Sequence, residues 1–554
     1  MKRLLLIFSL LGCALLSAQE RYSNPVLHWD YSDPDVCRVG EDYYMTASSF
    51  NCFPGLPILH SRDLVHWELT GAALTGYDAV FKTSVQHGNG VWAPSIRYHN
   101  GWFYIFVGDP DRGIFMVRSQ DPAGSWEPPV WVVREKGFID PCPFWDEDGR
   151  AYLSHGCAGS RAGLKSVLFV APMNSDGTAL TGPSRLVFDG HLSQPTIEGP
   201  KFYKRDGRYY IFAPAGGVTG GWQTVLRSDS PWGPYEERIV MAWAPGTVNG
   251  PHQGAWVSAP DGSDWFLHFQ DKGAYGRIVH LQPMVWRSDG WPLIGEDPDG
   301  DGVGQPVPSG EVPECAKSGN TLRKEEHSGP YGIGLEWQYP AIPSPYWHSA
   351  LADGGVRLYS VEQEPAANLW DCPNLLLQKF PAESFSVTAR LRFCPNPQLA
   401  GKGEQAGFLV MGNDYAGLRL TDTAEGARLE YVSCRDAGKG TEERVSQIAD
   451  LQYRFDKQAF PYSSGNVPAV KYPDRARVEL WVRLEVSPRV VEGSVPDAVC
   501  RFSYSRDGKR YRRLPDEFIA KPELWIGAKF GFYCNRPAPK NDAGWLDIEE
   551  LLIQ

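Results

Sequence analysis

The chain contains 554 residues, of which 42% are hydrophobic and 22% charged, and its formal net charge is -12. A chain of this length holds two or three domains, each large enough to bury a core. The acidic balance argues against a nucleic-acid partner, and the composition excludes long disorder and collagen-like repeats. The 20 Trp, 25 Tyr and 25 Phe favour strands over helices, and Trp and Tyr also offer the flat faces on which sugar rings stack.

Residues 1–18 have the pattern of a secretory signal peptide. A basic start, Met1-Lys2-Arg3, precedes a largely apolar run, and the small residue Ala18 stands at the expected cleavage point. The run is shorter than the roughly 20 apolar residues of a membrane-spanning helix. An alternative makes Cys13 the lipidated residue of a lipoprotein box, although the bulky Leu11 argues against it. We therefore expect an exported, periplasmic protein without a membrane span, with secretion or a lipid anchor at Cys13 as alternatives.

Cysteine usage adds little to this assignment. Ten of the 11 cysteines follow the signal peptide, spread along the chain without a CxxC motif or a Cys/His zinc signature. Export permits disulfides, but a protein with a large core does not need them, so buried free thiols are the favoured interpretation.

A short phrase recurs five times in the first 290 residues, where a turn with Gly and an acidic or amide residue is followed by aromatic residues. The last aromatic residues of the phrases stand 60, 48, 58 and 55 residues apart, at Tyr44, Tyr104, Tyr152, Tyr210 and Trp265. Each phrase is typical of a β-hairpin turn and the strand after it. Five all-β units of this length predict a five-bladed β-propeller over residues 22–295.

A second position recurs about ten to thirteen residues before each of these aromatic residues. There a polar or aromatic residue precedes Pro or Gly, at Asp33, Trp92, Asp140, Glu198 and His252. Because the first strand of each propeller blade lines the central channel, these side chains should converge on one axial pocket. Three carboxylates packed together raise one another's pKa and cost stability. Such a group is kept for function rather than for folding.

The sequence around these positions resembles glycoside hydrolase family 43. The resemblance rests on Ser32-Asp33-Pro34-Asp35, Phe53-Pro54-Gly55, Gly90-Val91-Trp92-Ala93-Pro94, Asp140-Pro141 and Glu198-Gly199-Pro200, with the three carboxylates in the family's order and approximate spacing. It covers residues 22–295. The resemblance implies an inverting glycosidase on a five-bladed propeller that acts on arabinofuranosides, xylosides, arabinan or galactan.

The resemblance also implies a role for each carboxylate. Asp33 is expected to be the general base that activates water. Asp35 is the alternative base, because strand alternation would place a residue two positions on at the same side of an extended strand. Glu198 is expected to be the general acid, which must arrive protonated to protonate the departing oxygen. Asp140 is expected to orient this acid and modulate its pKa. In an inverting enzyme the base and acid lie roughly 6.5–9.5 Å apart to leave room for the water.

Four further residues are expected to contact the sugar. Phe50 and Trp92 match the aromatic walls of the subsite, with a place in a blade core as the alternative. Arg277 matches an arginine that contacts sugar hydroxyls. His252 matches an axial histidine that holds a calcium ion or a water molecule. The reaction requires no cofactor, and a structural calcium ion at His252 stays open.

A second acidic group imitates the start of a calcium loop. It comprises Asp297, Asp299 and Asp301, followed by Gly302. The twelfth position of the loop is Pro308 instead of Glu, and no helices flank it. A solvated turn is therefore the favoured interpretation.

The rest of the chain is predicted to form a linker and another all-β domain. Residues 296–328 are rich in Gly, Pro and charged residues, which predicts the linker. Residues 329–554 show alternating strand patterns without a blade-sized repeat, which favours a two-sheet β-sandwich. This domain resembles the lectin-like, concanavalin-type sandwich of xylosidase-type family members, which packs against the propeller and helps to wall the pocket. The alternative is a carbohydrate-binding module that acts at a distance.

The leading hypothesis is an exo-acting inverting glycosidase that removes terminal α-L-arabinofuranosyl and/or β-D-xylosyl residues from plant cell-wall oligosaccharides. The two sugars present similar hydroxyls near the anomeric carbon, so one pocket can accept both. The alternatives are a β-xylosidase only, a catalytically silent carbohydrate-binding propeller, and a retaining relative such as a fructan hydrolase. The silent propeller should lack one of the three carboxylates, and the fructan hydrolase should open with an Asn-Asp-Pro-Asn-type motif. The sequence does not indicate an oligomeric state.

Overall fold

The computed structural model describes residues 20–76, 80, 82–243, 250–313, 332–352, 354–363, 366–456, 475–491 and 494–554. The predicted signal peptide, with Cys13, and residues 314–328 of the predicted linker lie outside the described residues. The described part is nearly all β-structure, with one α-helix, α1, at Gly159–Ala162. No helix in it is long and apolar enough to cross a membrane.

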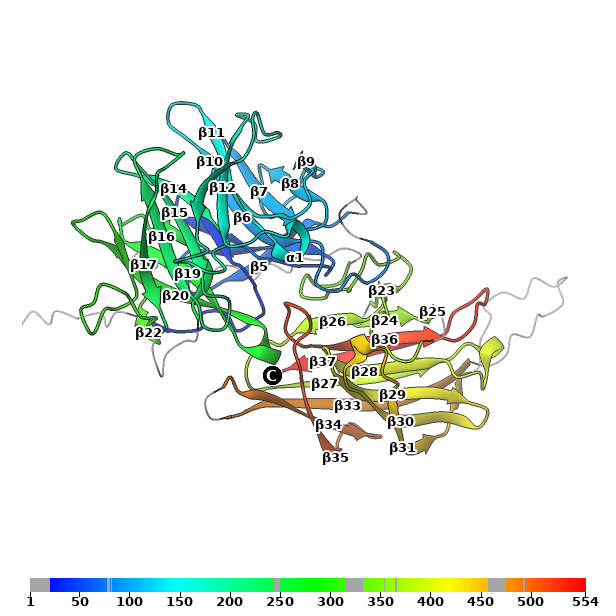
Figure 1. Cartoon of the computed structure of the whole chain (residues 1–554). Coiled ribbons are helices and arrows are strands. Elements are labelled where there is room, and N and C mark those ends of the chain that lie inside the picture. Colours follow the sequence, from blue (N-terminus) through cyan, green and yellow to red (C-terminus); the bar gives the residue numbers. More distant parts are fainter. Residues whose placement is uncertain are drawn as a thin grey trace, which may run out of the picture.

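The N-terminal half is a five-bladed β-propeller, which confirms the prediction (Figure 1). Each blade is a four-stranded antiparallel sheet whose strands follow one another in chain order. The first two blades are β2 (Asp35–Val39), β3 (Asp42–Thr46), β4 (Gly55–Ser61) and β5 (Glu68–Leu74), then β6 (Trp92–His99), β7 (Trp102–Asp109), β8 (Gly113–Ser119) and β9 (Val130–Val133). The third is β10 (Phe138–Trp145), β11 (Ala151–Cys157), β12 (Val167–Met173) and β13 (Arg185–Asp189). The last two are β14 (Lys201–Arg205), β15 (Arg208–Ala215), β16 (Trp222–Ser228) and β17 (Glu236–Ala242), then β18 (His252–Ser258), β19 (Asp264–Asp271), β20 (Arg277–Trp286) and β21 (Pro292–Ile294).

A left-handed kink marks the start of the inner strand in every blade. One residue just before a Pro or Gly has a positive φ between 33° and 58°, at Asp33, Ala93, Asp140, Gly199 and Gln253. In β6, β10 and β18 the pairing register shifts at this point. A left-handed conformation costs a residue other than glycine about 1–2 kcal/mol, and such strain concentrates at functional sites.

The two ends of the propeller are tied together by a short sheet. Strand β1 (Arg21–Ser23) pairs with β22 (Ser309–Glu311). The chain after β1 then runs along β20, where Leu27 bridges Val279. Because β22 falls inside the predicted linker 296–328, the first part of that segment belongs structurally to the propeller.

The C-terminal half is a β-sandwich, also as predicted. One sheet has eight strands: β23 (His348–Ala350), β24 (Val356–Tyr359), β37 (Trp545–Ile553), β27 (Phe385–Cys394), β33 (Arg475–Arg489), β34 (Asp497–Ser505) and β35 (Arg512–Ile519), with β32 (Arg454–Asp456) beside β33. The other has seven: β25 (Val361–Glu362), β36 (Lys529–Arg536), β28 (Gln405–Met411), β29 (Tyr415–Thr423), β30 (Gly426–Cys434) and β31 (Arg444–Leu451), with β26 (Leu376–Lys379) beside β36.

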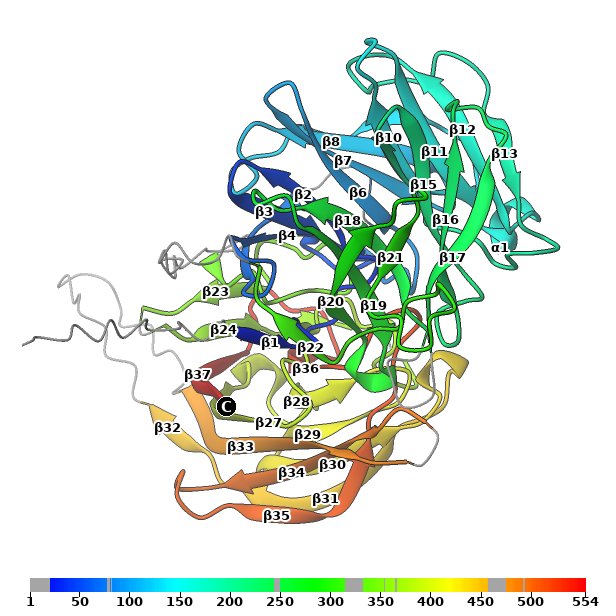
Figure 2. The same ribbon diagram turned by 90° about the vertical axis from the view of Figure 1, so that its left-hand side faces the viewer.

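The sandwich packs directly against the propeller, as both views show (Figures 1 and 2). Phe53 of the propeller and Tyr339 exchange two backbone hydrogen bonds of 2.8 Å. The Lys379 ammonium donates to the backbone oxygen of Asp30 at 2.5 Å. The backbone N–H of Ala528 donates a hydrogen bond of 2.8 Å to the backbone oxygen of Ala274. Hydrogen bonds therefore join the two domains directly. A carbohydrate-binding module that acts at a distance would not need such an interface.

The sandwich core consists of the inward-facing apolar residues of both sheets. Along β27 buried and partly exposed residues alternate, as expected for a strand with one face on the core. Phe532 is fully buried and stacks on Phe408, with 4.9 Å between the ring centroids. The nine cysteines that the structure describes are buried and unpaired.

The core packing predicts a large difference between two Phe→Ala substitutions. Phe532→Ala should destabilise the sandwich by about 3–5 kcal/mol, because it leaves a cavity between the sheets. Phe455→Ala is the matched control, because that side chain is 64% exposed. Urea unfolding followed by circular dichroism measures both. Equal midpoints for the two variants would contradict this account of the core.

Candidate active site

The kinked starts of the inner strands surround a cavity of about 100 Å³. The structure brings all seven predicted site residues to this cavity. The residues around it are Asp33, Phe50, Trp92, Ala93, Ile139, Asp140, Glu198, Val218, His252, Gln253, Arg277 and Trp525. Eleven of these twelve come from the propeller, and Trp525 comes from the sandwich.

The residues that converge here do not occupy strictly equivalent blade positions, which corrects the sequence-based alignment. Asp33 and Asp140 stand at the kinked residue itself. Trp92, Glu198 and His252 each stand one residue before it. Because the kink interrupts the alternation of a strand, both positions face the cavity.

The Asp33 carboxylate is buried and held by hydroxyl donors. Its Oδ2 accepts hydrogen bonds from the hydroxyl of Ser48 at 2.6 Å and from that of Ser32 at 2.9 Å. The guanidinium of Arg277 lies 3.6 Å from Oδ1 and donates to the Ser32 hydroxyl at 2.7 Å. These contacts fix the orientation of Asp33 at the edge of the cavity.

Asp140 and Glu198 form an acidic pair beside the cavity. The Asp140 carboxylate is buried and accepts a hydrogen bond of 2.9 Å from the backbone N–H of Gly199, directly after Glu198. Burial, and then the negative charge of Glu198, raise the pKa of Asp140 well above its usual range. The Glu198 side chain is 36% exposed, and its Oε1 lies 3.0 Å from Nε2 of His252. Glu198 is thus the more accessible of the two.

Asp35, the fallback base, lies outside the cavity. It is fully buried, and its Oδ2 accepts hydrogen bonds of 2.6 Å from both the Arg97 guanidinium and the backbone N–H of Ile96. The buried ammonium of Lys201 lies 3.9 Å from Oδ1. Asp35 is therefore a structural ion-pair partner in the channel, and the geometry leaves Asp33 as the base candidate.

Aromatic rings and one cation form the walls of the cavity. The ring of Trp92 lies edge-on to Phe50 at 6.4 Å and to Trp525 at 6.2 Å. The guanidinium of Arg277 lies over Phe269 at 4.8 Å and over Trp525 at 5.6 Å. Trp525 is the residue that sequence reasoning missed, because it stands in a loop of the second domain where no repeat or motif marks it.

Comparison with known proteins agrees with this geometry. The family model "Glycosyl hydrolases family 43" matches residues 22–292, and the model "Beta xylosidase C-terminal Concanavalin A-like domain" matches residues 326–551. A protein of Xylanibacter ruminicola named "Putative beta-xylosidase" is 39% identical over 450 residues, covering 80% of each chain. The chain belongs to glycoside hydrolase family 43.

Further relatives and solved structures cover most of this glycoside hydrolase. A Bacteroides ovatus protein named a non-reducing end alpha-L-arabinofuranosidase is 31% identical over 437 residues, covering 74% of this chain and 78% of its own. The crystal structure of a xylan beta-1,4-xylosidase from Bacillus halodurans superposes with a TM-score of 0.76 at 21% identity, covering 96% of this chain and 99% of the other. That likeness supports the fold of both domains.

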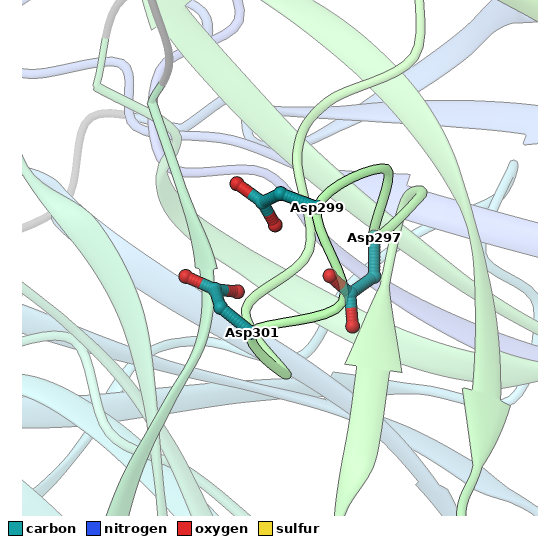
Figure 3. A group of neighbouring side chains, drawn as sticks. All are labelled: Asp297, Asp299 and Asp301. Carbon is teal, nitrogen blue, oxygen red and sulfur yellow. The ribbon is translucent and has the colours of Figure 1, made fainter.

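A calcium ion at His252 stays a prediction. One ring nitrogen of His252 faces Glu198, and in the described part no group of three Asp, Glu, His or Cys side chains gathers around it. Only Asp297, Asp299 and Asp301 approach one another in that way within the described ranges (Figure 3). Calcium takes six to eight oxygen ligands, some of which can be water molecules, and the side-chain contact that the structure gives His252 is the one of 3.0 Å to Glu198.

The turn that carries the three aspartates uses the Asp297 carboxylate for its own hydrogen bonds. The Asp297 carboxylate accepts hydrogen bonds from the backbone N–H groups of Gly300 at 2.8 Å and Gly302 at 3.0 Å, and from the Arg287 guanidinium at 3.1 Å. Asp299 and Asp301 are exposed. This pattern is typical of a turn stabilised by an aspartate side chain.

The raised pKa of Asp140 predicts that its neutral variant is more stable than the native enzyme. The folded state holds the Asp140 proton to higher pH than the unfolded chain, whose pKa is about 3.9, so this group destabilises the fold as pH rises above that value. Asp140→Asn should raise the melting temperature at pH 8, and this difference from the native enzyme should disappear at acidic pH. Thermal unfolding across pH measures this.

Asp146→Asn is the control with the opposite sign. Burial acts to raise the pKa of Asp146, but hydrogen bonds from Lys204 and Tyr209 lower it overall. Its charge therefore stabilises the fold above the unfolded pKa, and this stabilisation is lost as pH falls. Asp146→Asn should lower the melting temperature at pH 8. A lower melting temperature of Asp140→Asn at pH 8 would contradict the raised pKa assigned to Asp140.

Proposed function

We propose that this enzyme is an inverting exo-glycosidase that removes α-L-arabinofuranosyl and/or β-D-xylosyl residues from the non-reducing ends of plant cell-wall oligosaccharides. The observation that carries the proposal is the meeting of Asp33, Asp140 and Glu198 in one aromatic-walled cavity. The names of the Xylanibacter ruminicola and Bacteroides ovatus relatives support the choice of sugars. A catalytically silent propeller is less well supported, because all three carboxylates are present.

In this mechanism Asp33 and Glu198 act on opposite sides of the sugar. The Asp33 carboxylate takes a proton from a water molecule, and the water oxygen attacks the anomeric carbon. Glu198 gives its proton to the glycosidic oxygen as the bond to the anomeric carbon breaks. The sugar leaves with inverted configuration, and the protons of both carboxyl groups re-equilibrate with solvent. His252, at 3.0 Å from Glu198, holds the acid in place.

Asp140 interacts with the acid through charge and through the backbone. Its buried carboxyl lies beside Glu198; burial, and then the negative charge of Glu198, raise the pKa of Asp140. The Asp140 carboxylate also accepts a hydrogen bond from the backbone N–H of Gly199, which fixes the chain directly after Glu198. Asp140 thereby acts as the residue that modulates and orients the acid.

The walls of the cavity bind the terminal sugar. Arg277 presents a buried guanidinium whose Nε has no hydrogen-bond partner among the described atoms, so it can donate to a sugar hydroxyl. Phe50, Trp92 and Trp525 supply apolar ring surface for the carbon face of the sugar. Because the sandwich closes one side through Trp525, the cavity suits a chain end better than the middle of a polymer.

Substitutions of the base and the acid should differ in their dependence on the leaving group. Asp33→Asn should lower kcat at least about 10³-fold on every substrate, because no other group takes the proton from water. Glu198→Gln should lose oligosaccharide hydrolysis but keep much of its rate on dinitrophenyl glycosides, whose leaving group needs no proton. Steady-state rates measure this, with circular dichroism as the folding control. Equal losses of Glu198→Gln on both substrates would contradict its role as the acid.

The stereochemistry and the mode of attack form a separate prediction. Proton NMR of the first-formed sugar should show the anomer opposite to that of the substrate, with nitrophenyl α-L-arabinofuranoside and β-D-xyloside tested side by side. Retained configuration would overturn the inverting mechanism. Viscosity of a long arabinoxylan should fall slowly relative to sugar release, whereas a rapid fall would show internal cleavage.

A further inference from the structure

A loop of the sandwich, residues 523–527, reaches the cavity of the propeller. It lies between β35 and β36, and its Trp525 lines the cavity beside Trp92 and Arg277. Trp525 has a φ of 70°, and a bulky residue rarely adopts this left-handed conformation. The loop therefore needs contacts from outside to stay in this conformation.

The first such contact joins Glu523 to the propeller. Its Oε1 lies 2.5 Å from Nδ1 of His87, and both side chains are largely buried, with exposures of 12% and 16%. The His87 ring also stacks on Trp370 of the sandwich, with 3.8 Å between the ring centroids, and its Nε2 lies 3.3 Å from Asp371. A short, largely buried hydrogen bond accepted by a carboxylate is among the stronger polar contacts in proteins.

The second contact is made by the Asp30 carboxylate, which joins the loop to the sugar-binding arginine. Its Oδ2 accepts a hydrogen bond of 2.8 Å from the backbone N–H of Gly527. Its Oδ1 accepts one of 2.7 Å from the backbone N–H of Arg277. Asp30 is 5% exposed. One carboxylate thus fixes the end of the loop to the backbone of a cavity residue.

Close backbone packing supports both contacts. A Cβ atom on Gly88, next to His87, would lie 2.5 Å from the Leu524 side chain. A Cβ atom on Gly527 would lie 2.6 Å from the backbone nitrogen of Gly276, next to Arg277. Glycine at these two positions lets the loop approach the propeller closely at both ends.

We propose that His87, through Glu523, and Asp30, through Gly527, are positioning residues that hold Trp525 over the cavity and thereby set the affinity for the terminal sugar. This inference rests on the proposed function. Neither residue lines the cavity, so neither touches the sugar. When the loop is seated for only a fraction of the time, the apparent affinity falls by that fraction.

The test uses the full-length enzyme and the better of the two nitrophenyl glycosides. His87→Phe keeps an aromatic ring for Trp370 but removes the donor to Glu523, and it should raise KM about tenfold with kcat nearly unchanged. His87→Asn, whose amide nitrogen can replace Nδ1, should restore much of the affinity. Glu523→Gln is the second variant if His87→Phe does not fold.

His60→Phe is the matched control. His60 is also 16% exposed, contacts Asp42 at 2.8 Å and stacks on Tyr44, but it does not line the cavity or approach the loop. Its KM should match that of the native enzyme. A similar rise of KM in His60→Phe would show a general loss of stability and overturn the proposal.

The decisive comparison repeats the substitution in a Trp525→Ala background. If the contact acts through Trp525, His87→Phe should add less than about twofold to the KM of Trp525→Ala, because the two effects are then not additive. Equal factors in both backgrounds, or a fall of kcat at constant KM, would overturn the proposal. A native enzyme that releases neither arabinose nor xylose would refute the proposed function. An active enzyme whose KM is the same with His87 and with His87→Phe would refute only this inference.

Discussion

Electrostatic repulsion among Asp33, Asp140 and Glu198 is the interaction on which the rest of the propeller's axis depends. Burial disfavours the ionised form of Asp140 most strongly, and the charges of Glu198 and Asp33 disfavour it further. The surroundings offset this cost locally: two serine hydroxyls and Arg277 contact Asp33, and a backbone N–H contacts Asp140. The site therefore keeps acidic groups close enough to act on one sugar without unfolding the domain.

A second layer of charge lies in the channel away from the cavity. Asp35 is buried between the Arg97 guanidinium and the Lys201 ammonium. Burial acts to lower the pKa of Arg97, but the charge of Asp35 raises it well above its usual value overall. A buried charge that loses its partner costs several kcal/mol. This layer thus ties three blades together through their inner strands, and it explains why two aspartates only two residues apart have different roles.

The kinked inner strands connect this electrostatic arrangement to the backbone. A regular strand presents every second residue to one side, whereas the left-handed residue before Pro or Gly lets two consecutive positions face the cavity. The left-handed conformation recurs in all five blades, and it strains the four in which the residue is not glycine. The sandwich then completes the site from outside, because Trp525 supplies a wall that the five blades do not provide.

Local sequence patterns determine much of the fold and of the candidate site of this protein. The repeated turn-and-aromatic phrase predicts five blades because each hairpin follows from turn chemistry within a few residues, and the position of Asp33, Asp140 and Glu198 within that repeat predicts their convergence. The alternating strands after residue 329 predict the sandwich for the same local reason. Three features were decided by tertiary structure: the burial of Asp35 in an ion pair, the pairing of β22 inside the predicted linker, and the placement of Trp525 at the cavity. Each depends on contacts between residues far apart in the chain, such as His87 and Glu523, which are separated by 436 positions. Local pattern carries no information about such contacts, because they form only when the folded chain brings distant segments together, within the propeller for Asp35 and β22 and between the two domains for Trp525.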